Sequence, residues 1–253
     1  MDTRFGCTRC GRCCHDLKLP LSVDEAIAWA GRGHQVQLLC ECLPQPFDVA
    51  IEDPYGRYRA ERAFESRCGD LVIRINVILV ASFEGPCPHL RPDNLCGEYE
   101  RRPRVCRIYP AEFAPGREIK PQAKACPPEA WGDGQPWLTR GGAVVSTDTQ
   151  MLIDEYRAVT RLDLAAKAIA CDLLGARKAA WVNEGYAVYT PSPAAAVAAL
   201  ESARSADRGE SRESRWSIVT NRPHTLRALR DAGANAEICT GGGAYIGFFP
   251  DGS

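Results

Sequence analysis

The sequence lacks any long apolar run, and this absence bears on where the protein resides. A membrane-spanning helix needs about 18–20 consecutive apolar residues, whereas the apolar run at 77–81 has only the length of a strand. The first seven residues also lack the charged-then-apolar layout of a secretory signal. We therefore expect a cytoplasmic protein without a membrane partner.

An excess of charge of one sign is also lacking. The chain carries 31 Lys and Arg against 32 Asp and Glu, a net charge of −1. A balanced charge gives no excess of positive side chains to bind the phosphates of a nucleic acid, so we expect no nucleic-acid partner. Histidine is scarce, with four residues, and the sequence shows no recognisable Ser–His–Asp catalytic triad.

Cysteine, by contrast, is abundant. The 253 residues include 13 cysteines, and all but Cys239 lie before residue 172. A secreted disulfide scaffold is usually shorter, has a signal peptide and carries an even number of cysteines. In a reducing compartment, cysteines at short spacing more often bind metal. The composition therefore predicts a metal site in the N-terminal half.

Two segments supply the predicted ligands. In the first, two consecutive C-x-x-C spacings allow three thiolates to converge on one centre. The side chains of adjacent residues diverge. We therefore expect one of Cys13 and Cys14 to bind a second ion or to lie next to the ligands of the first ion. The predicted metal ligands are Cys7, Cys10, Cys13, Cys14, Cys87, Cys96, Cys106 and Cys126.

The identity of the metal stays open at this level. Three thiolates at this spacing, with a remote cysteine followed by proline, are typical of four-iron clusters; Cys87 and Cys126 each precede a proline. Four to eight thiolates equally suit one or two tetrahedral zinc sites. An iron–sulfur cluster or iron is the favoured cofactor, and zinc is the alternative. His15 and His89 adjoin candidate ligands, but we interpret them as hydrogen-bonding or exposed.

Other residues near the cysteines suggest supporting roles. Arg107 and Tyr109 lie in the Cys106 motif, and we predict that they contact the cofactor by stabilising the negative charge of bound thiolates. Arg101 and Arg104 are interpreted as a solvated basic face. The cysteines without a motif are interpreted as buried small hydrophobes: Cys40, Cys42, Cys68, Cys171 and Cys239.

The motifs carry a family resemblance. They are the Cys7–Cys14 block, Cys87-Pro88-His89-Leu90, Cys96-Gly97-Glu98-Tyr99, and Arg102-Pro103-x-x-Cys106-Arg107-Ile108-Tyr109-Pro110. Over about residues 1–128 the chain resembles the YkgJ-type CxxCxxCC cysteine-cluster family of zinc- or iron-chelating domains. The resemblance implies metal chelation by the motif cysteines. A related domain occurs in flagellin lysine methylases, where an iron–sulfur centre is implicated in methyl transfer, which implies a protein or peptide substrate.

The fold class predicted is α+β, with a loop-rich, metal-stapled N-terminal domain. Ser22 and Glu25 form a capping-box pattern and predict a helix that ends at Gly31. Residues 71–83 predict a buried strand. Prolines indicate that 40–70 is irregular and that 85–137 is loop-dominated and ordered by metal rather than by a hydrophobic core.

The C-terminal half has a different sequence pattern. Apolar spacing predicts helices from 151 to 173 and, after an Ser192 cap, from 194 to 200. A small βαββ-like part follows, with a strand at 216–220, a helix at 225–232, and strands at 236–240 and 245–249 joined by a hairpin turn of three glycines. The predicted division is a metal-binding domain at 1–140, a helical segment at 141–205, a flexible linker at 206–215 and the βαββ-like segment at 216–253.

Overall fold

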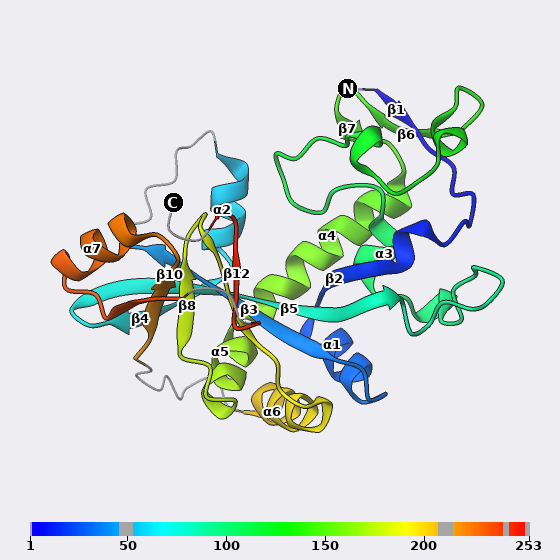
Figure 1. Ribbon diagram of the computed structural model, residues 1–253. Coiled ribbons are helices and arrows are strands. Elements are labelled where there is room, and N and C mark those ends of the chain that lie inside the picture. Colours follow the sequence, from blue (N-terminus) through cyan, green and yellow to red (C-terminus); the bar gives the residue numbers. More distant parts are fainter. Residues whose placement is uncertain (1, 46–52, 207–214, 240–242, 251–253) are drawn as a thin grey trace.

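The computed structural model describes residues 2–45, 53–206, 215–239 and 243–250, and these mix helices and strands (Figure 1). The strands are β1 (Thr3–Arg4), β2 (His15–Leu21), β3 (Val36–Pro44), β4 (Ala63–Cys68), β5 (Leu71–Pro86), β6 (Trp137–Arg140), β7 (Ala143–Val144), β8 (Lys178–Trp181), β9 (Gly185–Tyr189), β10 (Ser217–Thr220), β11 (Ala236–Ile238) and β12 (Tyr245–Gly247). The α-helices are α1 (Val23–Ala30), α2 (Pro54–Ala60), α3 (Arg104–Ile108), α4 (Thr147–Leu162), α5 (Leu164–Leu173), α6 (Pro193–Ser205) and α7 (Pro223–Asp231). The α+β prediction is confirmed.

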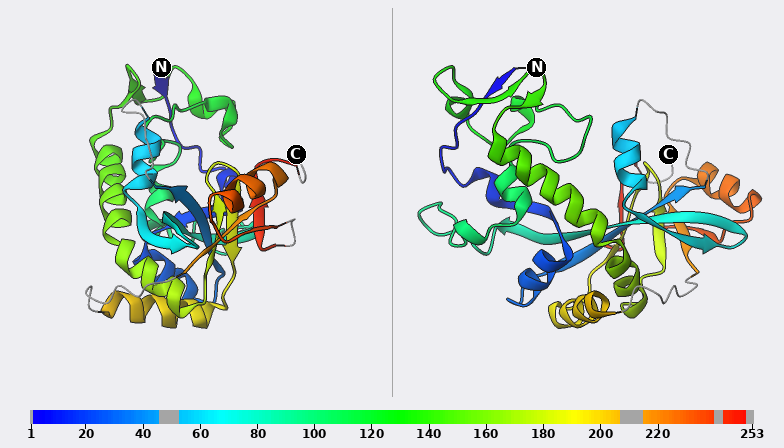
Figure 2. Two further views of the ribbon diagram at one scale, coloured as in Figure 1. Left: turned by 90° about the vertical axis from the view of Figure 1, so that its left-hand side faces the viewer. Right: turned by 180° about the vertical axis from the view of Figure 1, so that it is seen from behind.

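One large sheet organises the fold. Its strands follow the order β11-β10-β8-β3-β5-β2, with β4 paired to β5 and β9 paired to both β3 and β12. A separate small sheet has the order β1-β6-β7. Seen from behind, the small sheet and α7 lie toward opposite sides of the molecule (Figure 2).

The long strand β5 is apolar because both of its faces are covered. Ile75, Val77 and Leu79 belong to the main core with residues of α1, α5 and α6, and these helices lie on one side of β5 in Figure 1. Ile78 and Val80 point to the opposite face and pack in a smaller cluster with Leu39 and Val188. Side chains alternate along a strand, so a continuous apolar run is needed to fill both faces.

The predicted helix starts hold where a cap specifies them, although α6 runs to Ser205 rather than ending at residue 200. The Ser22 hydroxyl accepts the N–H of Glu25 at 3.3 Å, and the Glu25 carboxylate accepts the N–H of Ser22 at 2.9 Å, which completes the capping box of α1. At α6 the Ser192 hydroxyl accepts the N–H of Ala195 at 3.2 Å, with Pro193 at the first helical position. Helices α4 and α5 confirm the helical prediction for 151–173.

The prediction of irregular structure at 40–70 is wrong. Strand β3 extends to Pro44, and α2 and β4 follow at 54–60 and 63–68. The prolines mark the borders of these elements: Pro44 ends β3, and Pro54 is the first residue of α2 after the Asp53 cap. Proline is tolerated at both kinds of position because no backbone hydrogen bond is lost there.

The prediction of a C-terminal hairpin is also wrong. Strand β11 pairs in parallel with β10, whereas β12 pairs antiparallel with β9. The glycines suggested a tight turn, but each strand finds its partner at a different place in the large sheet. Gly241, Gly242 and most of the predicted linker, 207–214, lie outside the described residues. The element order of the βαββ-like part is as predicted.

The stretch 85–137 is loop-dominated as predicted, but it has an apolar core. Three short 3-10 helices, η2 (Tyr99–Arg101), η3 (Pro121–Ala123) and η4 (Pro128–Trp131), flank or follow α3 within it. Val105 and Ile108 pack with Leu138, Ile153 and Tyr156 in a second cluster of buried side chains. Hydrophobic packing therefore helps to order this stretch. The proposed division at residues 140, 205 and 215 stays a prediction; the large sheet draws strands from both sides of residue 140.

Helix α5 contains a buried cation. Lys167 is 4% exposed, and burial lowers the pKa of its ammonium from 10.5 to about 8 despite the opposing effect of Asp163. That carboxylate instead accepts the N–H of Val23 at 2.8 Å. Among the described residues, the Lys167 ammonium has no hydrogen-bond or ion-pair partner. Burying an unpaired charge is costly.

No helix within the described ranges is both long and apolar enough to cross a membrane.

We expect Lys167→Met to stabilise the fold by up to about 3 kcal/mol at pH 7, since each pKa unit corresponds to about 1.4 kcal/mol. The unfolded wild-type chain keeps its proton up to about pH 10.5, whereas the folded chain loses it near pH 8. Wild-type stability should therefore rise between these values, and the advantage of the variant should shrink there. Urea unfolding at pH 7 and pH 10 measures both effects. A less stable variant at pH 7 would contradict the assignment.

Candidate metal centre

Strand pairing brings the two cysteine-bearing segments together. Strands β2 and β5 are antiparallel, and His15 at the start of β2 lies opposite Pro86 at the end of β5. Cys14 directly precedes β2 and Cys87 directly follows β5. The N–H of Cys87 donates to the carbonyl of Cys14 at 2.7 Å. Residues 73 positions apart in the chain are thus neighbours at one end of the sheet.

A cavity of about 520 Å³ lies at this junction. Five of the eight predicted ligands line it: Cys13, Cys14, Cys87, Cys96 and Cys106. Leu17 and Leu19 of β2 and Trp29 of α1 contribute apolar wall, and Arg102 contributes a cation.

Gly11 shapes the N-terminal part of the site. It has φ of 70°, and its carbonyl accepts the N–H of Cys14 at 2.9 Å, which turns the chain into the short 3-10 helix η1 (Arg12–Cys14). A Cβ at this position would meet Asn94 at 3.1 Å and Leu90 at 3.3 Å. A residue without a side chain therefore allows the first segment to pack closely against the second.

The second segment is a compact loop. The N–H of Leu90 donates to the backbone carbonyl of Cys87 at 2.8 Å, and the N–H of Gly97 donates to the backbone carbonyl of His89 at 2.8 Å. Leu90 and Cys96 form an isolated antiparallel bridge. These bonds fold the loop back on itself and place Cys87 and Cys96 together at the cavity.

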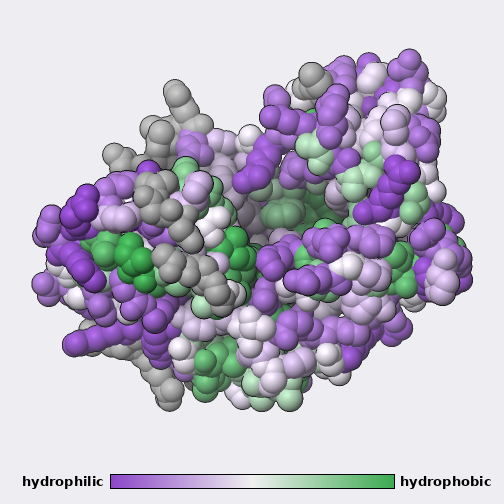
Figure 3. Space-filling model, in the orientation of Figure 1, coloured by the Kyte–Doolittle hydropathy of each residue, from purple (hydrophilic) through white to green (hydrophobic). Residues whose placement is uncertain are grey.

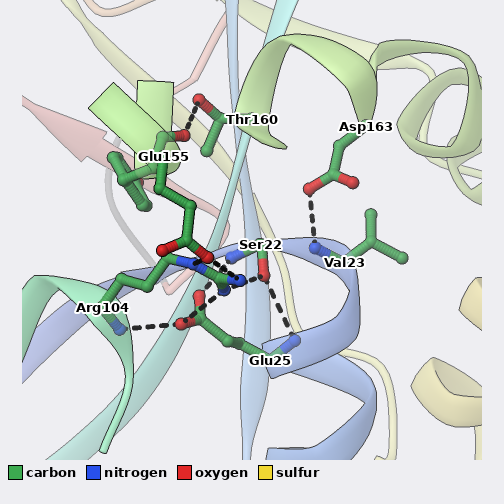
Figure 4. Close-up of polar contacts among 8 residues, drawn as sticks. Ser22, Val23, Glu25, Arg104, Glu155, Thr160 and Asp163 are labelled. Atoms are coloured by element: carbon green, nitrogen blue, oxygen red, sulfur yellow. Dashed lines mark hydrogen bonds and ion pairs between the residues drawn. The ribbon is translucent and has the colours of Figure 1, made fainter. Parts of the chain in front are cut away.

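The third cysteine-bearing segment, α3, is held by a polar network around Glu25 (Figure 4). The Glu25 carboxylate, already part of the α1 capping box, accepts the backbone N–H of Arg104 at 2.7 Å and pairs with its guanidinium at 3.1 Å. The same guanidinium donates to Glu155 of α4 at 2.9 Å. The network connects α1, α3 and α4, and so positions Cys106 on α3. Arg104 is therefore not on a solvated face, contrary to the interpretation from sequence.

The thiols at the cavity influence one another electrostatically. A hydrogen bond from Cys13 lowers the pKa of Cys14, against the opposing effects of burial and of Cys106. Cys87 and Cys96 oppose the shift in the same way. Burial, reinforced by Cys87, raises the pKa of Cys106 to about 12. Thiols with raised pKa values are protonated at neutral pH, so metal binding would release protons.

Cys7, Cys10 and Cys126 lie outside the cavity lining. They are nevertheless near one end of the cluster, because the pKa of Cys126, raised mainly by burial, is also raised by Cys13, Cys10 and Cys7. Cys13, one of the five cavity cysteines, therefore also lies near this outer group of three. Cys13 and Cys14 both line the cavity, so the expectation that they serve different positions stays a prediction.

The ligand geometry is not preformed. None of the thirteen cysteines, all of which lie within the described residues, forms a disulfide. Within residues 2–45, 53–206, 215–239 and 243–250, no three Cys, His, Asp or Glu side chains are arranged to bind one metal ion. The donor chemistry fits a thiophilic metal, because five thiols reach one cavity from three segments. Coordination would require side-chain movement within the cavity.

The two predicted cofactor-contacting residues differ in placement. Tyr109 lines the cavity, and its hydroxyl accepts the N–H of Ala125 at 3.0 Å and a weak bond from the Cys126 thiol at 3.7 Å. Arg107 is exposed and does not line the cavity. Arg102 does, and its charge acts to lower the pKa of both Cys13 and Cys106. The sequence signal for this residue was the Arg-Pro pair in the Cys106 motif.

The two histidines beside the cysteines also differ. His15 is exposed. His89 lines the cavity in an aromatic group, with its ring centroid 5.0 Å from that of Trp29 and 5.0 Å from that of His34. The Nε2 atom of His89 is buried and has no hydrogen-bond partner within the described residues. The His89 ring therefore has a nitrogen atom without a hydrogen-bond partner beside the cavity, which could serve as a metal ligand.

The comparison with protein families matches the segment that builds this site. Residues 6–127 match the family model CxxCxxCC, described as a "putative zinc- or iron-chelating domain". The matched segment is just under half of the chain, so the likeness to the CxxCxxCC family is a property of residues 6–127. All eight predicted ligands lie within the matched residues. No curated protein and no solved structure matches the chain. Residues 6–127 are thus similar to a cysteine-cluster domain that is described as zinc- or iron-chelating.

We expect Glu25→Ala to destabilise the protein by about 2 kcal/mol or more. The change removes half of the capping box, a charged acceptor for a backbone N–H and an ion pair. Glu155→Ala is the matched control: it removes only the exposed partner of Arg104 and should cost less than about 1 kcal/mol. Urea unfolding of both variants gives the two values. Equal losses would show that Glu25 does not hold α3.

Proposed function

We propose that the cysteine cluster of the CxxCxxCC segment binds an iron–sulfur cluster or iron, and that the cavity beside it receives part of a protein or peptide substrate. The observation that carries the proposal is the convergence of Cys13, Cys14, Cys87, Cys96 and Cys106 on one cavity. A single tetrahedral zinc needs four ligands in a closed arrangement. Five thiols around about 520 Å³ exceed that need, which favours a larger inorganic centre.

The chain offers means to stabilise such a centre. Thiolates around iron leave negative charge, and N–H groups that point to the sulfurs stabilise it. Arg102 is the cavity-lining cation whose charge acts on two of the cysteines. Its guanidinium is held against the Tyr99 ring, 3.7 Å from the centroid, and donates to the Tyr99 carbonyl at 2.8 Å. This support fixes its position at the cavity.

The cavity walls suit part of a peptide. Leu17, Leu19 and Trp29 supply apolar contact, whereas Glu98 and Arg101 supply charge of both signs. An iron–sulfur centre supplies electron-transfer or Lewis-acid chemistry when it is bound. The role proposed for the chain is to bind and orient the substrate beside that centre.

The alternative is a zinc-stapled interaction module without catalysis. It is favoured by the way the cysteines join three loop-rich segments, since structural zinc commonly stabilises small domains of this kind. Cys14 and Cys87 are already joined by a backbone hydrogen bond, so a metal would reinforce an existing junction.

Metal analysis of the full chain, purified without oxygen, separates the two proposals. We expect iron, with or without sulfide, and absorption near about 400 nm. Stoichiometric zinc in a colourless sample would contradict the iron proposal and favour the zinc module.

Variants of the cysteines test the ligand assignment. Cys106→Ser and Cys10→Ser should each lose most of the bound metal, because serine does not replace a thiolate ligand. Cys239→Ser is the control and should keep the wild-type metal content, since this residue lies outside residues 6–127. Retention of full metal content by Cys106→Ser would refute the cavity as the metal site.

A further inference from the structure

A second cavity lies on the opposite face of β2 from the cysteines. Side chains alternate along this strand: Leu17 and Leu19 line the cysteine cavity, whereas Lys18 and Pro20 line a separate cavity of about 250 Å³. The two cavities share no lining residue. Figure 3 shows a hollow in the surface between the parts that cover α2 and α4 in Figure 1, with apolar side chains at its base.

The second cavity is rich in cations. Arg59, Arg62 and Lys167 are buried, and Lys18 and Arg117 are exposed near its opening. The one carboxylate in the lining, that of Glu112, already pairs with Lys124 at 2.6 Å. The charges that line the cavity are therefore mainly positive.

Part of this positive charge is compensated by the protein. Arg59 pairs with Glu41 at 3.4 Å and donates to Asn183 at 2.9 Å. Arg62 donates to the hydroxyl of Thr160 at 3.0 Å and to the carbonyl of Arg157 at 2.6 Å. These bonds hold both guanidinium groups at the cavity wall.

Two buried donors at the cavity are left without partners. The Nε atom of Arg59 is buried and has no hydrogen-bond acceptor among the described residues. The ammonium of Lys167, 4% exposed, likewise lacks a hydrogen-bond or ion-pair partner within the described ranges. Arg117 makes no ion pair there either, although its guanidinium lies 4.6 Å from the Tyr55 ring centroid. Unpartnered buried donors beside a cavity indicate an acceptor that the protein does not supply.

The walls define the rest of the ligand. The rings of Tyr55 and Tyr58 are nearly parallel, with an interplanar angle of 13°, and Ile78 and Leu39 line the apolar side. Pockets for drug-sized molecules measure about 300–1,000 Å³, so this cavity suits a smaller molecule. Its chemistry combines a negatively charged head with a planar or apolar body.

We propose that this cavity binds a small organic anion, with a carboxylate or phosphate group that accepts hydrogen bonds from Arg59 and Lys167 and a planar or apolar body against the tyrosines. The structure offers a reason for an unpaired lysine at this place. A buried ammonium without a hydrogen-bond partner costs stability, and the anion would add a direct counter-charge to the longer-range effect of Asp163. No residue that lines this cavity also lines the cysteine cavity.

Calorimetric titration of the full chain at pH 7 tests the proposal with three probes of similar shape. Phenyl phosphate and benzoate carry the two candidate head groups, and benzyl alcohol carries none. We expect at least one of the anions to bind and benzyl alcohol not to bind, and the better anion identifies the head group. Lys167→Met should weaken the binding of that anion by about ten- to a hundredfold, since a hydrogen bond to a charged group is lost.

Two further variants make the test specific. Arg117→Gln changes an exposed cation at the opening and should give a smaller loss of affinity. Arg204→Gln is the control, because Arg204 pairs with Asp24 on the surface at 2.8 Å, away from the cavity. The affinity of this variant for the anion should equal that of the wild type. Circular dichroism verifies that each variant is folded. Binding of benzyl alcohol as tightly as the anions, failure of both anions to bind, or unchanged affinity in folded Lys167→Met would each overturn the proposal.

Discussion

The antiparallel pairing of β2 with β5 is the constraint on which the functional architecture depends. Register places the residue before β2 beside the residue after β5, so Cys14 and Cys87 meet through a backbone hydrogen bond. The register of this pair is fixed by burial, because a slip of one residue would turn Leu19 and Leu21 of β2 away from the main core. Hydrophobic patterning in the middle of the sheet therefore decides where thiols gather at its end.

The same strand separates two different chemical environments. One face of β2 borders a cavity rich in sulfur, and the other borders a cavity rich in cations and tyrosines. Both depend on side chains from remote elements. Glu25 in the α1 cap holds the helix that bears Cys106, and Glu41 in β3 holds Arg59 at the second cavity. In each case a carboxylate of one element positions a residue of a separate helix.

Both cavities also contain groups that are held in unfavourable states. Burial raises the pKa of Cys106 to about 12 and lowers that of Lys167 to about 8. In both cases burial disfavours the charged form of the group. A cation bound near the thiols, or an anion bound near the lysine, would reverse these effects. Perturbed groups of this kind cluster at functional sites because stability alone gives no reason to keep them.

The sequence by itself determined the cysteine-cluster segment, the starts of the capped helices α1 and α6 and the buried strand β5, and it predicted the metal ligands as a set. These depend on local spacing, on caps and on apolar periodicity, which act between residues close in the chain. It did not determine the pairing of β11 and β12, the regular structure at 40–70 or the choice of Arg102 over Arg107 at the cavity. Only the tertiary structure decided those, and it alone revealed the second cavity, since Arg59, Arg117 and Lys167 lie on separate elements and share no motif. Strand partners and convergent charges depend on long-range packing, which leaves no short-range pattern in the sequence.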